Sequence, residues 1–241
     1  MILALVSDIH ANREALEAVL QDIEKQKVDK IYCLGDVIGY GSDPVACLDM
    51  VKQNCEVVLM GNHEYAVLGK LPSSQLNETA KVSIAWTQNQ IDERLIPMIS
   101  DLPTSASLGE LHFVHASPYE PDHWHYILSP EHAELAFQHF TQRICFHGHS
   151  HLPTIFAGFG GQIRRQAGHD FQPNEETRYL VNVGSVGQPR DNDPRASYVL
   201  YDDQEDEVRF CRVEYDISAA QRKMREQDLP TMLIARLETG R

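Results

Sequence analysis

Cysteines are few in this 241-residue sequence, and none of them forms a C-x-x-C pair. The five are an odd set, so they cannot all pair within one chain. Two of them lie in apolar runs that are typical of buried strands. This pattern favours reduced structural thiols over a disulfide framework. The cysteines are Cys33, Cys47, Cys55, Cys145 and Cys211.

Long hydrophobic runs are also absent. The apolar stretch Met1–Val6 meets a charged residue at Asp8, too early for the hydrophobic region of a signal peptide. No later segment approaches the roughly 20 apolar residues that a membrane-spanning helix needs. We therefore expect a cytoplasmic protein without a membrane partner.

Positive charge is scarce, because 21 Lys and Arg face 35 Asp and Glu, for a formal net charge of -14. Such a surface repels polyanions at long range, and no local basic strip offsets it. Binding of extended nucleic acid is therefore not expected. A small phosphorylated substrate remains compatible, because bound divalent cations can reverse the sign of the potential inside one pocket.

Internal repeats, low-complexity stretches and linkers are absent as well. The hydrophobic share of 42% is enough for a sizeable core. We therefore predict a single domain over residues 1–241.

The first part of the chain alternates strand-like and helix-like patterns. Apolar runs at 2–6, 31–34 and 57–60 are strand-like, and helix-start signals occur at Asn12 and Pro44. Alternation of this kind predicts a parallel sheet.

Later segments predict an insertion, a hairpin and further strands. Residues from about 65 to 102 lack strand character and predict a helical insertion that caps the site. Residues 104–114 predict a hairpin, and a capping box at Ser218 predicts a C-terminal packing helix. Short strands of a second sheet are predicted at 144–146, 154–157, 179–183, 197–201 and 208–213.

Polar side chains directly follow several of these predicted strands. Ligand sites in open α/β sheets lie at the carboxyl ends of the strands, so we expect these side chains to gather at one edge. The residues are Asp8, His10, Asp36, Asn62, His63, His115, His149 and His151.

This set of residue types is typical of a metal centre. Asp, Asn and His ligands without thiolate suit Mn²⁺, Fe, Zn²⁺ or Ni²⁺, and one carboxylate can lie between two ions. We predict that Asp36 is this bridge. Two ions about 3.5–4 Å apart can clamp a phosphoryl group and lower the pKa of a shared water towards about 7. The resulting hydroxide attacks phosphorus in line, and no protein nucleophile is needed.

The order of the motifs resembles that of the calcineurin-like metallophosphoesterase superfamily. The resemblance spans about two-thirds of the chain, and five blocks in order are far more specific than any one of them. It implies a two-sheet β-sandwich flanked by helices, in four layers (α/β/β/α). The blocks are Asp8-x-His10, Gly35-Asp36, Gly61-Asn62-His63-Glu64, His115 and Gly148-His149-x-His151.

The resemblance also implies a role for each residue. It places Asp8, His10 and His151 on one metal. It places Asn62, His115 and His149 on the other metal, and Asp36 on both. His63 is then the catalytic residue that protonates the leaving oxygen or, as a cation, steadies the transition state. A histidine beside a ligand can instead be a support for the centre.

The block after Gly35-Asp36 departs from two branches of this superfamily. Protein Ser/Thr phosphatases and symmetric dinucleoside tetraphosphate hydrolases carry Asp and Arg where this chain has Gly39 and Tyr40. The chain instead looks like the prokaryotic phosphodiesterase-like branch, which shares Gly39-Tyr40-Gly41 and the stretch 182–190. This favours a phosphodiesterase or nucleotide phosphohydrolase. The alternatives are a phosphomonoesterase or protein phosphatase, and a non-catalytic scaffold of the same fold.

Substrate contacts are less specified by the sequence. Arg190 and Arg195 can hold a phosphate or form surface ion pairs. Tyr40 and the segment 123–125 can stack on a base or simply pack.

Overall fold

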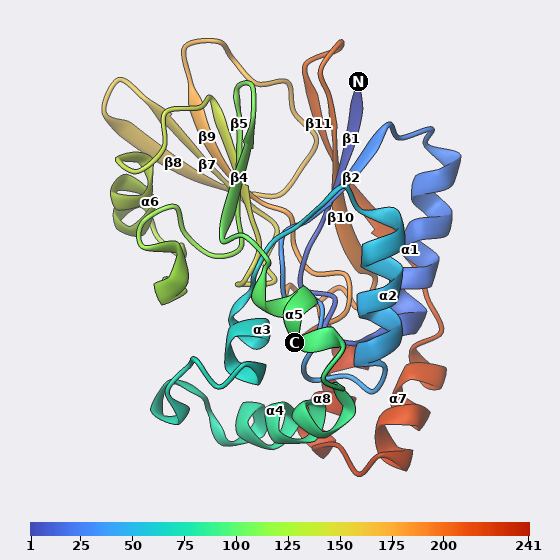
Figure 1. Cartoon of the computed structure of the whole chain (residues 1–241). Coiled ribbons are helices and arrows are strands. Elements are labelled where there is room, and N and C mark those ends of the chain that lie inside the picture. Colours follow the sequence, from blue (N-terminus) through green and yellow to red (C-terminus); the bar gives the residue numbers. More distant parts are fainter.

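The computed structural model describes residues 1–241, apart from the side chain of Ser73. Two β-sheets lie face to face in the middle of the molecule, and helices cover their outer sides (Figure 1). This arrangement confirms the predicted two-sheet architecture flanked by helices.

The first sheet has the strand order β11-β10-β1-β2-β3. As predicted, β1, β2 and β3 run parallel. The assignment of 197–201 and 208–213 to the second sheet is wrong, because β10 pairs antiparallel with β1 and with β11. A pattern of apolar residues predicts a strand, but it does not predict the sheet edge with which that strand pairs. The strands are β1 (Ile2–Val6), β2 (Lys30–Cys33), β3 (Val57–Val58), β10 (Ala196–Asp202) and β11 (Glu207–Val213).

The second sheet has the order β4-β5-β6-β9-β7-β8. Its first two strands form the predicted hairpin. The sequence did not predict β8, because four of its six residues are polar and five are exposed. The strands are β4 (Ser105–Leu108), β5 (Leu111–Val114), β6 (Ile144–His147), β7 (Thr154–Phe159), β8 (Gln162–Ala167) and β9 (Arg178–Asn182).

The outer helices begin at local capping signals. The Asn12 side chain accepts a hydrogen bond from the Ala15 N–H at the start of α1 (Arg13–Lys25), and Pro44 opens α2 (Pro44–Asn54). The capping box at Ser218 is wrong, because Asp216 caps α7 (Ile217–Glu226) two residues earlier. On the second sheet, α6 (Pro130–Phe137) packs against β7 and β8, and α8 (Thr231–Thr239) packs against α7 at the lower end of the molecule in Figure 1. In the part of the chain that the structure describes, no helix is long and apolar enough to cross a bilayer.

The segment predicted as an insertion is helical. It contains α3 (Asn62–Val67), η1 (Ser73–Gln75), α4 (Glu78–Gln90) and α5 (Leu95–Ser100). These helices lie below the strand ends in Figure 1. The prediction that this insertion covers the site, and the prediction of a single domain, are not tested by the structure and stay predictions.

Two large apolar clusters hold the layers together. Val6 and Leu16 belong to the cluster between the first sheet and its helices. Leu5, Phe113 and Phe146 belong to the cluster between the two sheets. Because β1 alternates its side chains between these clusters, it is buried on both faces, and the loop that follows it is held firmly.

Candidate metal centre

The loops after β1 and β2 hold each other at the edge of the first sheet. The Asp8 N–H donates to the Gly35 carbonyl at 3.0 Å, and the His10 N–H donates to the Asp36 carbonyl at 2.9 Å. Asp8, His10 and Asp36 adopt left-handed φ angles of 54°, 50° and 53°. Such conformations are strained for non-glycine residues and cluster at functional sites.

The second sheet brings its own loops to the same place. His115 follows β5, and the loop after β6 carries His149 and His151, both with left-handed φ angles. Gly148 lets this loop approach the first sheet, because a Cβ there would lie 2.3 Å from Asp8 Oδ2. The His149 N–H donates to Asp8 Oδ2 at 3.0 Å. The site therefore forms where the two sheets meet.

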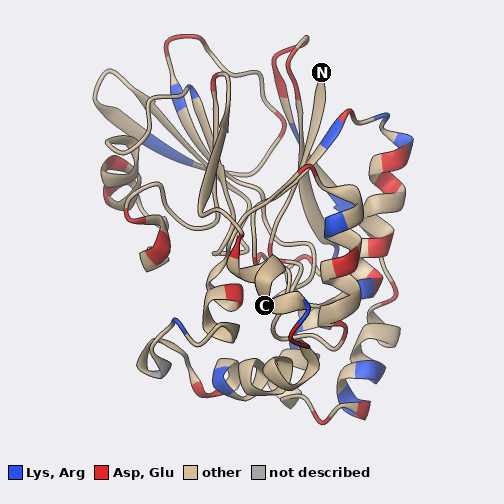
Figure 2. Ribbon diagram, in the orientation of Figure 1, with Lys and Arg blue, Asp and Glu red and all other residues tan. Residues whose placement is uncertain are grey.

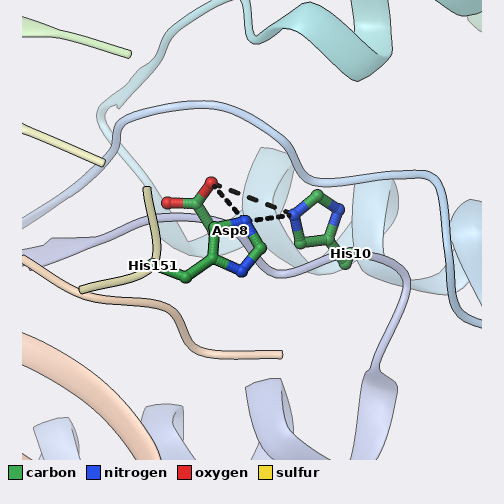
Figure 3. Close-up of side chains that lie close together, drawn as sticks. All are labelled: Asp8, His10 and His151. Carbon is green, nitrogen blue, oxygen red and sulfur yellow. Dashed lines mark hydrogen bonds and ion pairs between the residues drawn. The ribbon is translucent and has the colours of Figure 1, made fainter. Parts of the chain in front are cut away.

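One group of ligand atoms comprises Asp8, His10 and His151 (Figure 3). The two imidazole Nε2 atoms are 3.0 Å apart, and Asp8 Oδ1 lies 3.3 Å from His151 Nε2 and 3.9 Å from His10 Nε2. The three side chains are buried. Three metal-binding atoms within such distances can share one ion.

A second group comprises Asp36, His115 and His149. Asp36 Oδ2 lies 3.3 Å from His115 Nε2, and Asn62 Oδ1 lies 3.2 Å from the same nitrogen. Asp36 Oδ2 is also 3.7 Å from His10 Nε2, an atom of the first group. Asp36 thus lies between the two groups.

Backbone carbonyls orient three of the imidazoles. The Nδ1 atoms of His10, His115 and His151 lie 3.3, 3.0 and 2.6 Å from the carbonyls of residues 38, 34 and 188, respectively. A proton on each Nδ1 leaves each Nε2 with its lone pair towards the centre, as in metal-binding histidines. His149 Nε2 is buried without a hydrogen-bond partner among the described residues.

The charges of the centre favour a cation. Burial lowers the pKa of His149 to about 3, so its imidazole is neutral and can donate a lone pair. Burial also acts to lower the pKa of His115, but the Asp36 carboxylate outweighs it and raises that pKa to about 9. A proton is thus bound strongly beside Asp36, where a divalent ion would find the same negative potential. The donor set fits divalent metals.

Comparison with known proteins agrees with this geometry. Residues 1–206 match the sequence model of the calcineurin-like phosphoesterase superfamily domain. The chain belongs to this superfamily. Membership of this superfamily points to a phosphoester hydrolase. The family uses divalent metals, and the Asp and His groups of the chain could bind such ions.

Similar proteins cover the whole chain. A metallophosphoesterase from Sphaerobacter thermophilus is 37% identical, with a TM-score of 0.88 over 100% of this chain and 99% of that one. An uncharacterised protein of Methanocaldococcus jannaschii is 36% identical over 100% of this chain and 98% of its own length. A hypothetical protein from Pyrococcus horikoshii OT3 is 19% identical and shares the fold, with a TM-score of 0.81 over 100% and 98% of the two chains.

Glu64 supports the centre of this phosphoesterase, a role that the sequence analysis missed. Its buried carboxylate accepts hydrogen bonds from the N–H groups of Asp36 at 2.9 Å, Ile38 at 3.1 Å and Gly61 at 2.9 Å. Burial, together with the Asp36 charge, raises the pKa of Glu64 to about 7. The available signal was its place directly after Asn62-His63 in a polar block.

The late stretch 182–190 also supports the loops that carry the candidate metal ligands. The Ser185 hydroxyl donates to the Asp8 carbonyl at 2.7 Å and accepts from the Gln188 N–H at 2.8 Å. The Asn182 amide donates to the Ser150 hydroxyl at 3.0 Å, between two ligand candidates. Residues of this stretch therefore hold the ligand-bearing loops in place through hydrogen bonds.

His63 lies beside the two groups of ligand atoms. Its ring centroid is 4.7 Å from that of His10 and 4.3 Å from that of Tyr40. Burial lowers its pKa to about 4. His63 Nδ1 is buried, and none of the described residues pairs with it.

The two predicted phosphate-binding arginines have different surroundings. The Arg190 guanidinium lies 6.0 Å from the Tyr40 ring centroid, and it donates to Gln188 Oε1 at 3.0 Å. Arg195 is ion-paired with Asp193 at 2.6 Å, and its side chain is 48% exposed. The structure therefore brings Arg190, and not Arg195, towards the side chains around His63.

The segment 123–125 splits between core and surface. Trp124 is buried, with its ring centroid 5.9 Å from that of His115. His123 and His125 are exposed, and both lie within 3.1 Å of Glu120 Oε2. The next residue, Tyr126, stacks on His149, which the sequence analysis did not anticipate.

Proposed function

We propose that the chain is a phosphodiesterase or nucleotide phosphohydrolase that holds two divalent ions. The observation that carries this proposal is the position of Asp36, whose Oδ2 atom lies within 3.7 Å of His10 Nε2 and 3.3 Å of His115 Nε2. A carboxylate so placed suits a bridge between two ions. The proposed ligands are Asp8, His10 and His151 on one ion, Asn62, His115 and His149 on the other, and Asp36 on both.

The chain's own residues would position the metal ligands and protonate the leaving group. When bound, the ions clamp the phosphoryl group and make water nucleophilic at neutral pH. Glu64 and Ser185 hold the ligand loops in place. His63 is the proposed proton donor to the leaving oxygen, and an anionic phosphate beside its ring would raise its lowered pKa.

The arginine side chains that the sequence analysis proposed as phosphate contacts favour a diester over a monoester as the substrate. A monoester carries up to two negative charges, and the protein Ser/Thr phosphatases, which act on such groups, carry an arginine in the block where this chain has Tyr40. The Arg190 guanidinium already donates a hydrogen bond to Gln188, and Arg195 is ion-paired with Asp193. A singly charged diester needs less compensation than a dianion.

A small phosphorylated molecule is the proposed partner. Lys and Arg lie scattered among Asp and Glu along the ribbon (Figure 2), so the long-range field does not attract polyanions. A non-catalytic scaffold is disfavoured because the chain retains all seven candidate ligands and His63.

The first experiment compares three proteins on bis(p-nitrophenyl) phosphate with added Mn²⁺. Native protein and the Asp49→Asn control, which changes an exposed residue of α2, should turn over. Asp36→Asn should not, because it weakens both proposed ion sites. Faster hydrolysis of p-nitrophenyl phosphate than of the diester would favour the monoesterase alternative. Failure on both substrates would favour the scaffold.

A further inference from the structure

Tyr126 lies directly against His149, a proposed ligand of the metal centre. Its ring centroid is 4.0 Å from that of His149, and the two planes differ by 26°. Tyr126 is 47% exposed, whereas His149 is buried. The aromatic ring therefore contacts a proposed metal ligand on one side and solvent elsewhere. An exposed ring at this position is available to a substrate whose phosphoryl group lies on the centre.

A cavity of about 260 Å³ opens beside Tyr126. It includes a second stacked pair, because the ring centroid of Tyr119 lies 5.1 Å from that of His125 with an interplanar angle of 18°. Leu135 is 40% exposed at its wall. The cavity is lined by Ser117, Tyr119, His125, Tyr126, Ile127, His132 and Leu135.

The size and lining of this cavity indicate what it accepts. Sites for whole drug-sized ligands span roughly 300–1,000 Å³, so this smaller cavity suits one ring system. Aromatic and aliphatic walls favour a flat, weakly polar group, and every nucleobase has a π-face that can stack on tyrosine. The Ser117 hydroxyl and the imidazole of His132 add polar groups at the wall.

We propose that Tyr126 and this cavity form a subsite for a planar aromatic group, such as a nucleobase, that is attached to the reacting phosphate. This inference rests on the proposed function, since it requires the phosphoryl group at the metal centre. It narrows the substrate class to aryl or nucleoside phosphoesters. Tyr126 then sets specificity, and it also covers one face of His149.

The test compares two ligands that differ only in the base. AMP and ribose 5-phosphate are titrated by calorimetry into the Mn²⁺-loaded protein, which requires no turnover. Stacking on an aromatic side chain is worth roughly 1–3 kcal/mol per base, so AMP should bind about tenfold more tightly than ribose 5-phosphate. Equal affinities for native protein would overturn the subsite.

Variants separate stacking from mere packing. Tyr126→Ala should abolish the preference for AMP, and Tyr126→Phe should keep it. Leu135→Trp should also remove it, by filling the cavity while the Tyr126 ring stays in place. Phe159→Ala, which removes an exposed aromatic ring at the end of β7, is the matched control and should bind like native protein.

The outcomes keep this inference apart from the proposed function. If Tyr126→Ala weakens both ligands equally, the ring only supports His149 and the subsite is overturned. If native protein prefers AMP yet hydrolyses no ester, the subsite stands and the proposed function fails. If it hydrolyses diesters without any base preference, the proposed function stands and the subsite fails.

Discussion

The backbone at Gly39 passes directly against the His63 imidazole. Gly39 has a φ of +80°, and a Cβ there would lie 2.0 Å from His63 Nδ1. No L side chain fits without displacing the ring. The glycine in the Gly39-Tyr40-Gly41 block is thus explained by the histidine beside it, a contact between residues 24 positions apart.

Replacement of Gly39 by Ala should therefore impair catalysis. Displacement of a reacting group by about 1 Å can cost on the order of 100-fold in rate, so we expect a loss of this size in kcat for the diester. Gly109→Ala is the matched control, because its φ of +55° is also left-handed but its Cβ would meet no described atom within 4 Å. Equal turnover by the two variants would contradict the proposed role of His63.

His63 itself offers a direct test of the proposed proton donor. General acid catalysis contributes typically 10²–10⁴-fold, so His63→Ala should lower kcat by about that range. Metal content, measured by elemental analysis, should stay at the native level because His63 is not among the proposed ligands. His169→Ala, at an exposed histidine, serves as the control. Native turnover in the His63 variant would rule out the acid role.

Glu64 should be needed for both stability and metal binding. Its two carboxylate oxygens accept three backbone N–H groups, and the amide of Gln would turn a donor towards at least one of them. We expect Glu64→Gln to cost about 1–3 kcal/mol in unfolding free energy and roughly 10–100-fold in metal affinity. Urea unfolding and Mn²⁺ titration measure these effects. The exposed Glu24→Gln should change neither, and native behaviour of the Glu64 variant would refute the supporting role.

At the scale of elements, the C-terminal helices pack beneath Tyr40. Buried side chains of α7 and α8 form one apolar cluster with Tyr40, and the Gln221 amide donates to the Ile234 carbonyl at 2.9 Å. The Arg236 guanidinium also donates to Gln188 Oε1 at 3.3 Å. These contacts agree with the predicted packing role of the C-terminal segment.

Neighbouring residues of α8 allow a test of this packing. Leu233 is 1% exposed and Met232 is 60% exposed. Leu233→Ala should lower the unfolding free energy by about 2–5 kcal/mol, whereas Met232→Ala should stay within about 0.5 kcal/mol of native. Urea denaturation measures both. Similar stabilities for the two variants would show that α8 contributes little to the fold.

At the scale of the whole molecule, the proposed ions would join the two sheets. Asp8, His10 and Asp36 follow strands of the first sheet, and His115, His149 and His151 follow strands of the second. Anything bound across this junction stabilises the folded chain, because the unfolded chain cannot present the same atoms together.

Removal of the metal should therefore lower the melting temperature. Binding at 100 times Kd contributes about 2.7 kcal/mol, which for a chain of this size corresponds to a Tm shift of roughly 5–10 °C. Scanning calorimetry with Mn²⁺ and then with EDTA measures the difference. In Asp36→Asn the shift should largely disappear, while Asp49→Asn should retain it. An equal response in native protein and Asp36→Asn would argue against Asp36 as a shared ligand.

Local sequence signals determined most of the candidate centre. Each candidate ligand lies in a loop or at a helix start that follows an apolar strand, and the carboxyl ends of parallel strands in one sheet meet at one edge, so the gathering of Asp8 and Asp36 could be predicted. His149 follows a strand of the second sheet, so its place beside them depends on how the two sheets pack. Asn12 and Pro44 likewise predict the starts of α1 and α2, because helix capping depends on interactions within a few residues. The metal-binding role of these side chains stays a prediction.

Only the tertiary structure decided which distant segments meet. The apolar pattern of β10 fits either sheet, and its pairing with β1 depends on an edge almost 200 residues away. The hydrogen bonds of Glu64, in α3, and the stacking of Tyr126 on His149 also join separate segments of the chain. Periodicity reports which face of an element is buried but not against what, because the partner is chosen by packing of the whole chain.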